Sequence, residues 1–150
     1  EKTQLTFYFY PEISGNASSV NLSAESDPEI IKCDVDTMDN FVKEHNVIKL
    51  DFIKMDIEGA ELFAFEGGID TIKKFKPIVF TEMLRKWSAK FGYHPNQIIE
   101  IFAKMNYDCF FVNENRLEII KEMTEETIET NFFFLHKEKH SEQISKYNTS

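Results

Sequence analysis

Glycine is scarce in this sequence. The five glycines stand at positions 15, 59, 67, 68 and 92, and no two of them are separated by a single residue. A turn that lets the backbone approach a dinucleotide or a similar ligand closely depends on such G-x-G spacing. No glycine-rich loop of that kind can therefore be built from this sequence.

Cysteine, positive charge and long apolar stretches are also in short supply. The two cysteines, Cys33 and Cys109, lie far apart, which excludes a disulfide framework and a C-x-x-C zinc site. The 17 Lys and Arg are outnumbered by 26 Asp and Glu, and the net charge of -9 argues against a nucleic-acid partner. No apolar run is long enough for a membrane span, and the first ten residues lack a signal-peptide pattern, so we expect no membrane partner and a cytoplasmic location.

The sequence does have the composition of a folded domain. Hydrophobic residues make up 42% of the chain and aromatic residues 14%, with 15 Phe among them. A length of 150 residues suits one domain. No repeat or linker divides the chain, but the apolar residues fade after position 136. We therefore expect 137–150 to be a polar, solvated tail.

Strand and helix patterns alternate through the middle of the chain. Strands are predicted at 5–10, 30–35, 52–57, 78–82, 109–112 and 131–135. Helices are predicted at 38–44 after the capping residue Thr37, from 60 to the Lys76-Pro77 pair with a break at Gly67-Gly68, and at 95–106. This order predicts an α/β domain with a parallel sheet. The charged stretch 114–130 is interpreted as a surface excursion.

The most informative segment is Ile53-Lys54-Met55-Asp56-Ile57-Glu58-Gly59-Ala60-Glu61-Leu62, in which a short apolar strand runs into a helix. Four further segments accompany it in a fixed order, namely the loop 14–19, Asp36-Thr37-Met38-Asp39-Asn40-Phe41, Phe65-Glu66-Gly67-Gly68 and Lys76-Pro77-Ile78-Val79-Phe80-Thr81-Glu82. Together they resemble the FkbM-type methyltransferase family. The resemblance runs from about Phe7 to Leu135.

The resemblance implies a Rossmann-like methyltransferase sheet with an antiparallel last strand and S-adenosylmethionine as the methyl donor. Members of the family typically methylate hydroxyl groups of sugars, polyketides or other small molecules. In such enzymes a glycine-rich turn holds the donor, and this sequence has none. We therefore interpret residues 1–136 as the C-terminal part of a methyltransferase domain, and expect the chain on its own to bind the donor weakly and to be inactive.

Carboxylates follow two neighbouring strands of the predicted sheet. Asp56 and Glu58 end one strand and Glu82 ends the next. Ligands of open α/β sheets gather at the carboxyl ends of strands, so we expect these three side chains to converge. Asp56 or Glu58 would orient or deprotonate the acceptor hydroxyl. A Mg²⁺ ion, which prefers oxygen ligands, is a candidate for assisting this step.

The same residues also have structural interpretations. Lys54 can contact the acceptor, or it can form an ion pair with Asp56 or Glu82. Glu58 can cap the helix that begins near Gly59, where negative charge is favoured. For Glu61, a first-turn glutamate, the helix dipole is a sufficient explanation.

Aromatic residues follow the strand at 78–82. Trp87, Tyr93 and His94 are candidates for a wall over the acceptor, although aromatic residues in a connection more often cover the edge of a core. His45, His136 and His140 sit among charged residues without metal-ligand spacing, so we expect them to be solvated.

The alternative function is a non-catalytic binding or assembly module derived from the methyltransferase fold. In that case the strand at 52–57 would have an unpaired edge, and an unpaired strand edge favours association with another chain. A homo-oligomer formed through this sheet edge is the partner that the alternative implies.

Overall fold

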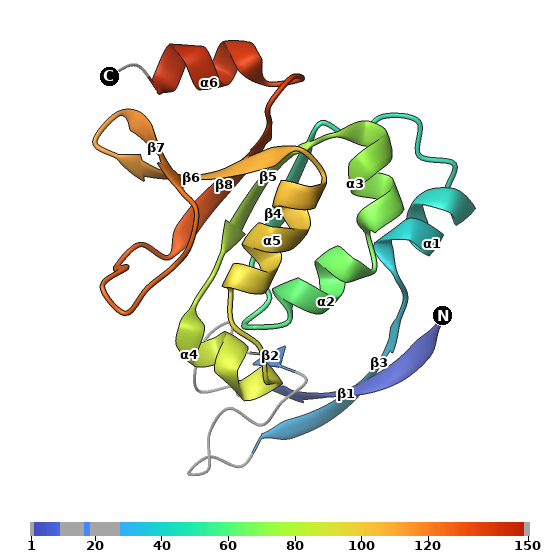
Figure 1. The fold of residues 1–150 in the computed structure, drawn as a ribbon. Helices are drawn as coiled ribbons and strands as arrows, with labels where there is room; N and C mark the ends of the chain where they lie inside the picture. Colours follow the sequence, from blue (N-terminus) through green and yellow to red (C-terminus); the bar gives the residue numbers. More distant parts are fainter. Residues whose placement is uncertain (1, 10–16, 19–27, 149–150) are drawn as a thin grey trace.

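The protein is described by a computed structural model, which covers residues 2–9, 17–18 and 28–148 (Figure 1). The strands are β1 (Thr3–Phe9), β2 (Ala17–Ser18), β3 (Glu29–Val35), β4 (Phe52–Met55), β5 (Ile78–Glu82), β6 (Tyr107–Asn113), β7 (Arg116–Ile120) and β8 (Asn131–His136). The helices are α1 (Met38–Glu44), α2 (Glu61–Glu66), α3 (Ile69–Phe75), α4 (Arg85–Ser88), the 3₁₀ turn η1 (Ala89–Phe91), α5 (Asn96–Lys104) and α6 (Ser141–Tyr147). Tyr10 and most of the loop predicted at 14–19 lie outside the described residues.

A five-stranded sheet forms the centre of the molecule, in the order β4-β5-β8-β6-β7. Strands β4 and β5 are parallel, whereas β8 runs antiparallel to both of its neighbours, β5 and β6. The α/β prediction is confirmed, with a mixed rather than a purely parallel sheet. Strand β4 occupies one edge, so only one of its sides is paired within this sheet.

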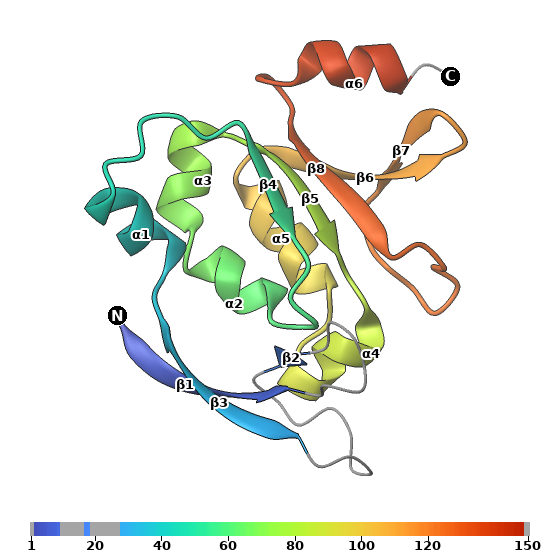
Figure 2. The same cartoon turned by 180° about the vertical axis from the view of Figure 1, so that it is seen from behind.

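Helices α2, α3 and α5 cover one face of this sheet, as Figures 1 and 2 show from opposite sides. The core between the layers is aromatic. Phe102 of α5 stacks on Phe134 with 4.1 Å between ring centroids and meets Phe65 and Tyr107 edge-on at 4.9 and 5.2 Å. All four side chains are buried. These contacts hold α2 and α5 against the sheet, because they remove large apolar rings from water.

The opposite face of the sheet is far less covered. Alternation along β4 leaves Phe52 and Lys54 exposed on this face, while Met55 is buried toward the helices. An apolar groove of about 370 Å³ lies here, lined among others by Phe52, Ile78 and Phe133. Helix α6 reaches one end of the groove through Tyr147.

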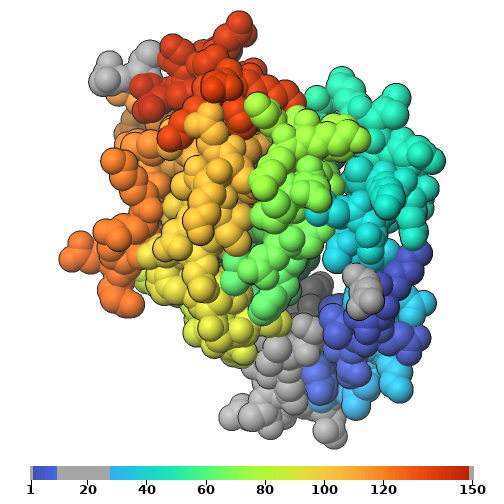
Figure 3. Space-filling model, turned by 45° about the vertical axis from the view of Figure 1, so that its right-hand side comes forward, coloured from blue at the N-terminus to red at the C-terminus, as the bar shows by residue number. Residues whose placement is uncertain are grey.

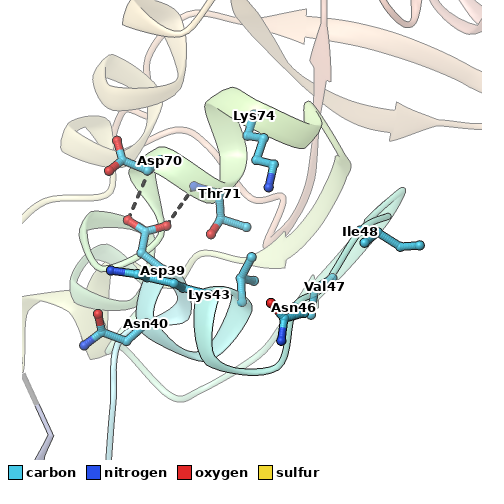
Figure 4. A pocket seen from close by; sticks show the side chains of 10 residues that line it. Asp39, Asn40, Lys43, Asn46, Val47, Ile48, Asp70, Thr71 and Lys74 are labelled. Atoms are coloured by element: carbon cyan, nitrogen blue, oxygen red, sulfur yellow. Dashed lines mark hydrogen bonds between the residues drawn. The ribbon is translucent and has the colours of Figure 1, made fainter.

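Helix α1 is fastened to the junction between α2 and α3. The Asp39 carboxylate accepts hydrogen bonds from the backbone N–H groups of Asp70 and Thr71, at 3.2 and 2.7 Å, and so caps α3 (Figure 4). A Cβ atom on Gly68 would lie 2.9 Å from the Met38 sulfur. The Gly67-Gly68 pair separates α2 from α3, as predicted. Because Gly68 has no side chain, α1 can approach it closely.

A separate three-stranded antiparallel sheet, β2-β1-β3, precedes α1. Its strands β1 and β3 pair along their whole length, from Thr3 with Val35 to Phe9 with Glu29. A groove of about 630 Å³ separates this sheet and α1 from α2, and Figure 3 shows the hollow between the blue strands and the green helix. Exposed Leu5, Phe41 and Phe63 line it.

The segment 114–130 is more than the predicted surface excursion. Its first part forms strand β7, which pairs with β6 in a hairpin. Met123 is buried, and its backbone N–H donates to the Asn96 Oδ1 atom at 2.7 Å, while the Asn96 amide donates to the Met123 carbonyl at 3.2 Å. The segment is mostly exposed, as predicted, but strand β7 and the buried Met123 were missed, because the long-range contacts that position them leave no pattern in the sequence.

The segment after β8 also differs from the prediction. Residues 141–147 form helix α6, and both His136 and His140 are buried rather than solvated. The Nδ1 atom of His140 accepts a hydrogen bond from the His136 backbone N–H at 2.9 Å, and the Nδ1 atom of His136 accepts from Glu138 and Lys139 at 3.3 Å. These hydrogen bonds to the two rings hold the turn between β8 and α6 in place.

Acid is expected to destabilise this turn. Burial is the main cause that lowers the pKa of His136 and His140 below the ordinary 6.5, with Lys76 and Lys139 adding to it and Glu138 opposing it at His136. The unfolded chain therefore binds protons more readily than the folded chain. The contribution of the two histidines to the free energy of unfolding is complete above pH 6.5, and it is lost as the pH falls toward their lowered pKa values.

Urea unfolding at about pH 7.5 and about pH 5 measures this loss. In the His140→Asn variant the Asn Oδ1 atom can accept the same N–H without titrating, so its stability should depend less on pH than that of the wild type. His45→Asn, at an exposed position, is the control and should keep the wild-type dependence. Equal pH dependence in all three proteins would contradict the prediction.

Candidate active site

The carboxyl ends of β4 and β5 bring the predicted carboxylates together. Met55 and Thr81 are partners in the parallel register of the two strands. Asp56 and Glu82 follow them directly, so both carboxylates stand at the same edge of the sheet. Glu58 lies two residues further, in the turn between β4 and α2.

The acidic groups at this edge act on one another electrostatically. Burial is the main cause that raises the pKa of Glu58, followed by the negative charges of Asp56 and Glu61. The pKa of Glu82 is raised by burial, then by Asp56 and Glu58. Lys86 opposes both shifts. Glu58 and Glu82 therefore each hold a proton more tightly than an ordinary glutamate.

Asp56 has a different environment. Its carboxylate accepts a hydrogen bond from the Lys54 ammonium at 3.1 Å, and both side chains are well exposed. Of the alternatives considered for Lys54, the structure shows the ion pair with Asp56. An exposed pair of this kind adds little stability, so its effect is mainly to orient the Asp56 carboxylate.

Glu61 is the residue that shapes the turn. Its side chain is only 3% exposed, and its Oε1 atom accepts hydrogen bonds from the backbone N–H groups of Ile57 and Gly59 at 3.1 and 3.2 Å. Its Oε2 atom accepts from the Tyr93 hydroxyl at 3.3 Å. Glu61, not Glu58, thus binds the free amides before α2. The sequence pattern, which accounts for Glu61 by the helix dipole alone, does not predict these buried hydrogen bonds.

Tyr93 belongs to that anchor. The side chain is buried, and burial raises the pKa of its hydroxyl to about 12. Its ring meets Phe63 edge-on at 6.0 Å. In the structure Tyr93 contacts the turn through Glu61, whereas its predicted contact with an acceptor stays a prediction.

Gly59 allows a second element to close over the turn. It has a φ of +101°, and a Cβ atom there would lie 2.9 Å from the Trp87 backbone and from the Phe91 ring. Glu58 beside it also has a positive φ, of 55°. A non-glycine residue adopts this conformation at a cost that the surroundings must offset, and such residues are common at functional sites.

Trp87 and His94 lie on either side of η1. Trp87 is half-buried, and the ammonium groups of Lys86 and Lys90 each lie 4.6 Å from the centre of its ring. His94 is exposed, and its Nδ1 atom accepts from the Asn96 N–H at 3.2 Å at the start of α5. The side chain of His94 therefore already has a local structural contact.

Comparison with known families identifies the group to which this arrangement belongs. A family model described as the methyltransferase FkbM domain matches residues 2–109, which is most of the chain. The chain belongs to the FkbM methyltransferase family. No curated protein and no solved structure matches it. None of the described helices is long and apolar enough to cross a membrane.

The FkbM family suggests S-adenosylmethionine as donor, and one turn of the chain can be checked for a contact with it. The turn at 56–60 is the glycine-containing turn that joins β4 to α2. Its Ile57 and Gly59 amides are already bound by Glu61, and the Trp87 backbone covers Gly59. Neither the amides nor the glycine surface is left for a ligand.

The Mg²⁺ expectation also finds no support within this FkbM chain. Across residues 2–9 and 28–148, no group of three or more His, Cys, Asp or Glu side chains is arranged to hold a metal ion. The carboxylate cluster of Asp56, Glu58 and Glu82 is close enough for electrostatic coupling, but it does not form a set of metal ligands.

Sequence reasoning missed one residue beside the cluster. Arg85 begins α4, three residues after Glu82, and its Nη1 atom is buried without a hydrogen-bond partner in the part of the chain that the structure describes. The only signal in the sequence is an arginine placed just after a strand end. That position alone does not show whether the guanidinium turns inward.

The close approach at Gly59 gives a stability prediction. Gly92 also has a positive φ, of 77°, but a Cβ atom there would meet nothing within 4 Å. Gly92→Ala should therefore lower the free energy of unfolding by about 1 kcal/mol, the cost of a left-handed alanine. Gly59→Ala should lower it by about 1–3 kcal/mol more, because the methyl group also displaces the Trp87 segment.

Urea unfolding of the two variants checks this difference, since each one shares the backbone cost of the other. Equal losses in both variants would mean that the packing of Trp87 against Gly59 does not contribute to stability.

Proposed function

We propose that this chain forms the acceptor side of an S-adenosylmethionine-dependent O-methyltransferase that acts on the hydroxyl group of a small molecule or sugar. Membership of the FkbM family supports methyl transfer. The observation that carries the acceptor role is the pair of carboxylates with raised pKa values, Glu58 and Glu82, at the ends of adjacent strands.

Hydroxyl methylation needs a group that takes the proton of the acceptor, and this pair of carboxylates can supply one. The hydroxyl oxygen becomes a good nucleophile when its proton is removed, and a carboxylate with a raised pKa accepts a proton more readily than an ordinary one. In our proposal the proton passes from the acceptor hydroxyl to the Glu58 carboxylate, and Glu82 holds the acceptor in position. Asp56, oriented by Lys54, keeps the local potential negative.

The arrangement of strands supports a Rossmann-like methyltransferase sheet, of which this chain would hold the C-terminal strands. The parallel pair β4 and β5, followed by an antiparallel β8 inserted beside β5, agrees with that arrangement. In open sheets of this kind ligands lie beyond the carboxyl ends of the strands, where the carboxylate cluster stands.

Neutralising the proposed base tests this function. In the longest natural form of the protein, Glu58→Gln should reduce the rate of methyl transfer to a hydroxylated acceptor by about 100-fold or more, because no group then takes the proton. The wild-type rate should fall as the pH drops through the raised pKa of Glu58, and the variant should lose this acidic limb.

Glu66→Gln, at an exposed position on α2, is the matched control and should behave like the wild type. A Glu58→Gln enzyme that folds normally and keeps the wild-type rate and pH profile would exclude Glu58 as the base. Glu82→Gln then shows whether the second carboxylate has that role instead.

The second candidate function is a non-catalytic assembly module. The observation that favours it is the unpaired side of β4, next to the exposed ring of Phe52 and the apolar groove. A strand edge beside exposed apolar surface can pair with a strand of another chain.

Sedimentation at increasing protein concentration tests this candidate. If copies associate through β4, Phe52→Lys should shift the equilibrium to the monomer, because it puts a charge into the apolar contact. Ile128→Lys, at an exposed position far along the chain, is the control and should leave association unchanged. A wild-type chain that stays monomeric throughout would argue against homo-oligomerisation through this edge.

A further inference from the structure

The guanidinium of Arg85 is incompletely bound. Its Nη2 atom donates to the Glu125 carbonyl at 3.3 Å, whereas its Nη1 atom is buried and has no hydrogen-bond partner within residues 2–9, 17–18 and 28–148. Among the described residues no carboxylate forms an ion pair with Arg85. Buried polar groups are almost always satisfied, and an unpaired charged donor is the costliest exception. Within the described part of the chain, this donor is therefore available to a bound ligand.

A cavity is available for that partner. It has a volume of about 540 Å³ and lies between the segment 83–86 and the segment 123–130. A hydrogen bond of 2.7 Å from the Met83 N–H to the Thr130 carbonyl joins the two walls. Thr127 and Thr130 add polar lining, and Glu125 and Glu129 add negative charge at the same walls.

Lys86 connects this cavity with the carboxylate cluster. It lines the cavity beside Arg85, and its charge also lowers the pKa of both Glu58 and Glu82. The cavity begins one residue after Glu82, at Met83. Lys86 therefore lines the cavity and is also within electrostatic reach of both carboxylates.

We infer that the Arg85 cavity binds an oxyanion, a carboxylate or a phosphate group, that belongs to the acceptor molecule. The planar guanidinium is suited to oxyanions, and Nη1 supplies the donor that the protein leaves unpaired. Glu125 and Glu129 disfavour anions that lack this hydrogen bond. The inference rests on the proposed function, and it narrows the acceptor to hydroxylated acids or phosphorylated sugars.

The binding part of the inference can be tested without methyl transfer. The sequence has two arginines, Arg85 and Arg116, so nitrogen-edited NMR gives two side-chain N–H signals to follow. Titration with inorganic phosphate or with acetate, at constant ionic strength set by chloride, should shift the Arg85 signal in a saturable way. The Arg116 signal, from an exposed hairpin residue, should not saturate.

Variants separate the Arg85 site from adventitious binding. Arg85→Gln should weaken phosphate or acetate binding about tenfold or more, Arg85→Lys less, and Arg116→Gln not at all. The anion that saturates at the lower concentration identifies the group. Linear shifts of equal size at both arginines, or an Arg85 signal that does not respond, would overturn the inference.

Kinetics connect the site to the acceptor. With an acidic acceptor, Arg85→Gln should raise KM about tenfold or more and leave kcat nearly unchanged. For the neutral ester of that acceptor, the substitution should leave KM unchanged. If neutral and acidic acceptors react equally well in the wild type, the inference fails and the proposed function stands. If phosphate saturates at Arg85 but Glu58→Gln and Glu82→Gln are fully active, the proposed base fails instead.

Discussion

The buried carboxylate of Glu61 is the constraint on which the candidate site depends. By accepting two backbone amides and the Tyr93 hydroxyl, it holds the turn after β4 in one conformation. Buried charges need such partners, because an unpaired carboxylate in this position would be strongly destabilising. The turn in turn sets the backbone of Glu58, and its glycine admits the Trp87 segment. One side chain thus links β4, α2, α4 and η1.

This constraint also explains the charge distribution at the sheet edge. Glu61 contributes to the raised pKa values of both Glu58 and Glu82, although its own oxygens are bound by hydrogen bonds. An acidic group that is satisfied structurally can therefore tune two neighbours that remain accessible to a ligand. The positive charge of Lys86 opposes the rise in the pKa of both glutamates, and Lys86 lines the cavity beside Arg85. Structure and proposed chemistry share the same few charges.

Much of the local structure was predictable, because it depends on neighbours in the sequence. The Thr37 cap, the break at Gly67-Gly68 and the strand at 78–82 agree with the structure. Strand β7 and helix α6 were not predicted, since their exposed faces are charged and the contacts that position them come from distant segments. His136 and His140 were misjudged for the same reason, because their partners are backbone groups that no sequence pattern reveals.

The sequence by itself determined the FkbM resemblance, the alternation of the central strands and helices, and the carboxylates at the strand ends. The resemblance rests on ordered local segments, the alternation on apolar patterns along the chain, and the placing of the carboxylates on the rule that parallel strands end at one edge. Only the tertiary structure decided the roles of these charged residues, with Asp56 bound to Lys54, Glu61 buried as the anchor, and Arg85 lining a cavity. Burial and hydrogen-bond partners are properties of the packed chain, and two glutamates three residues apart are distinguishable only there.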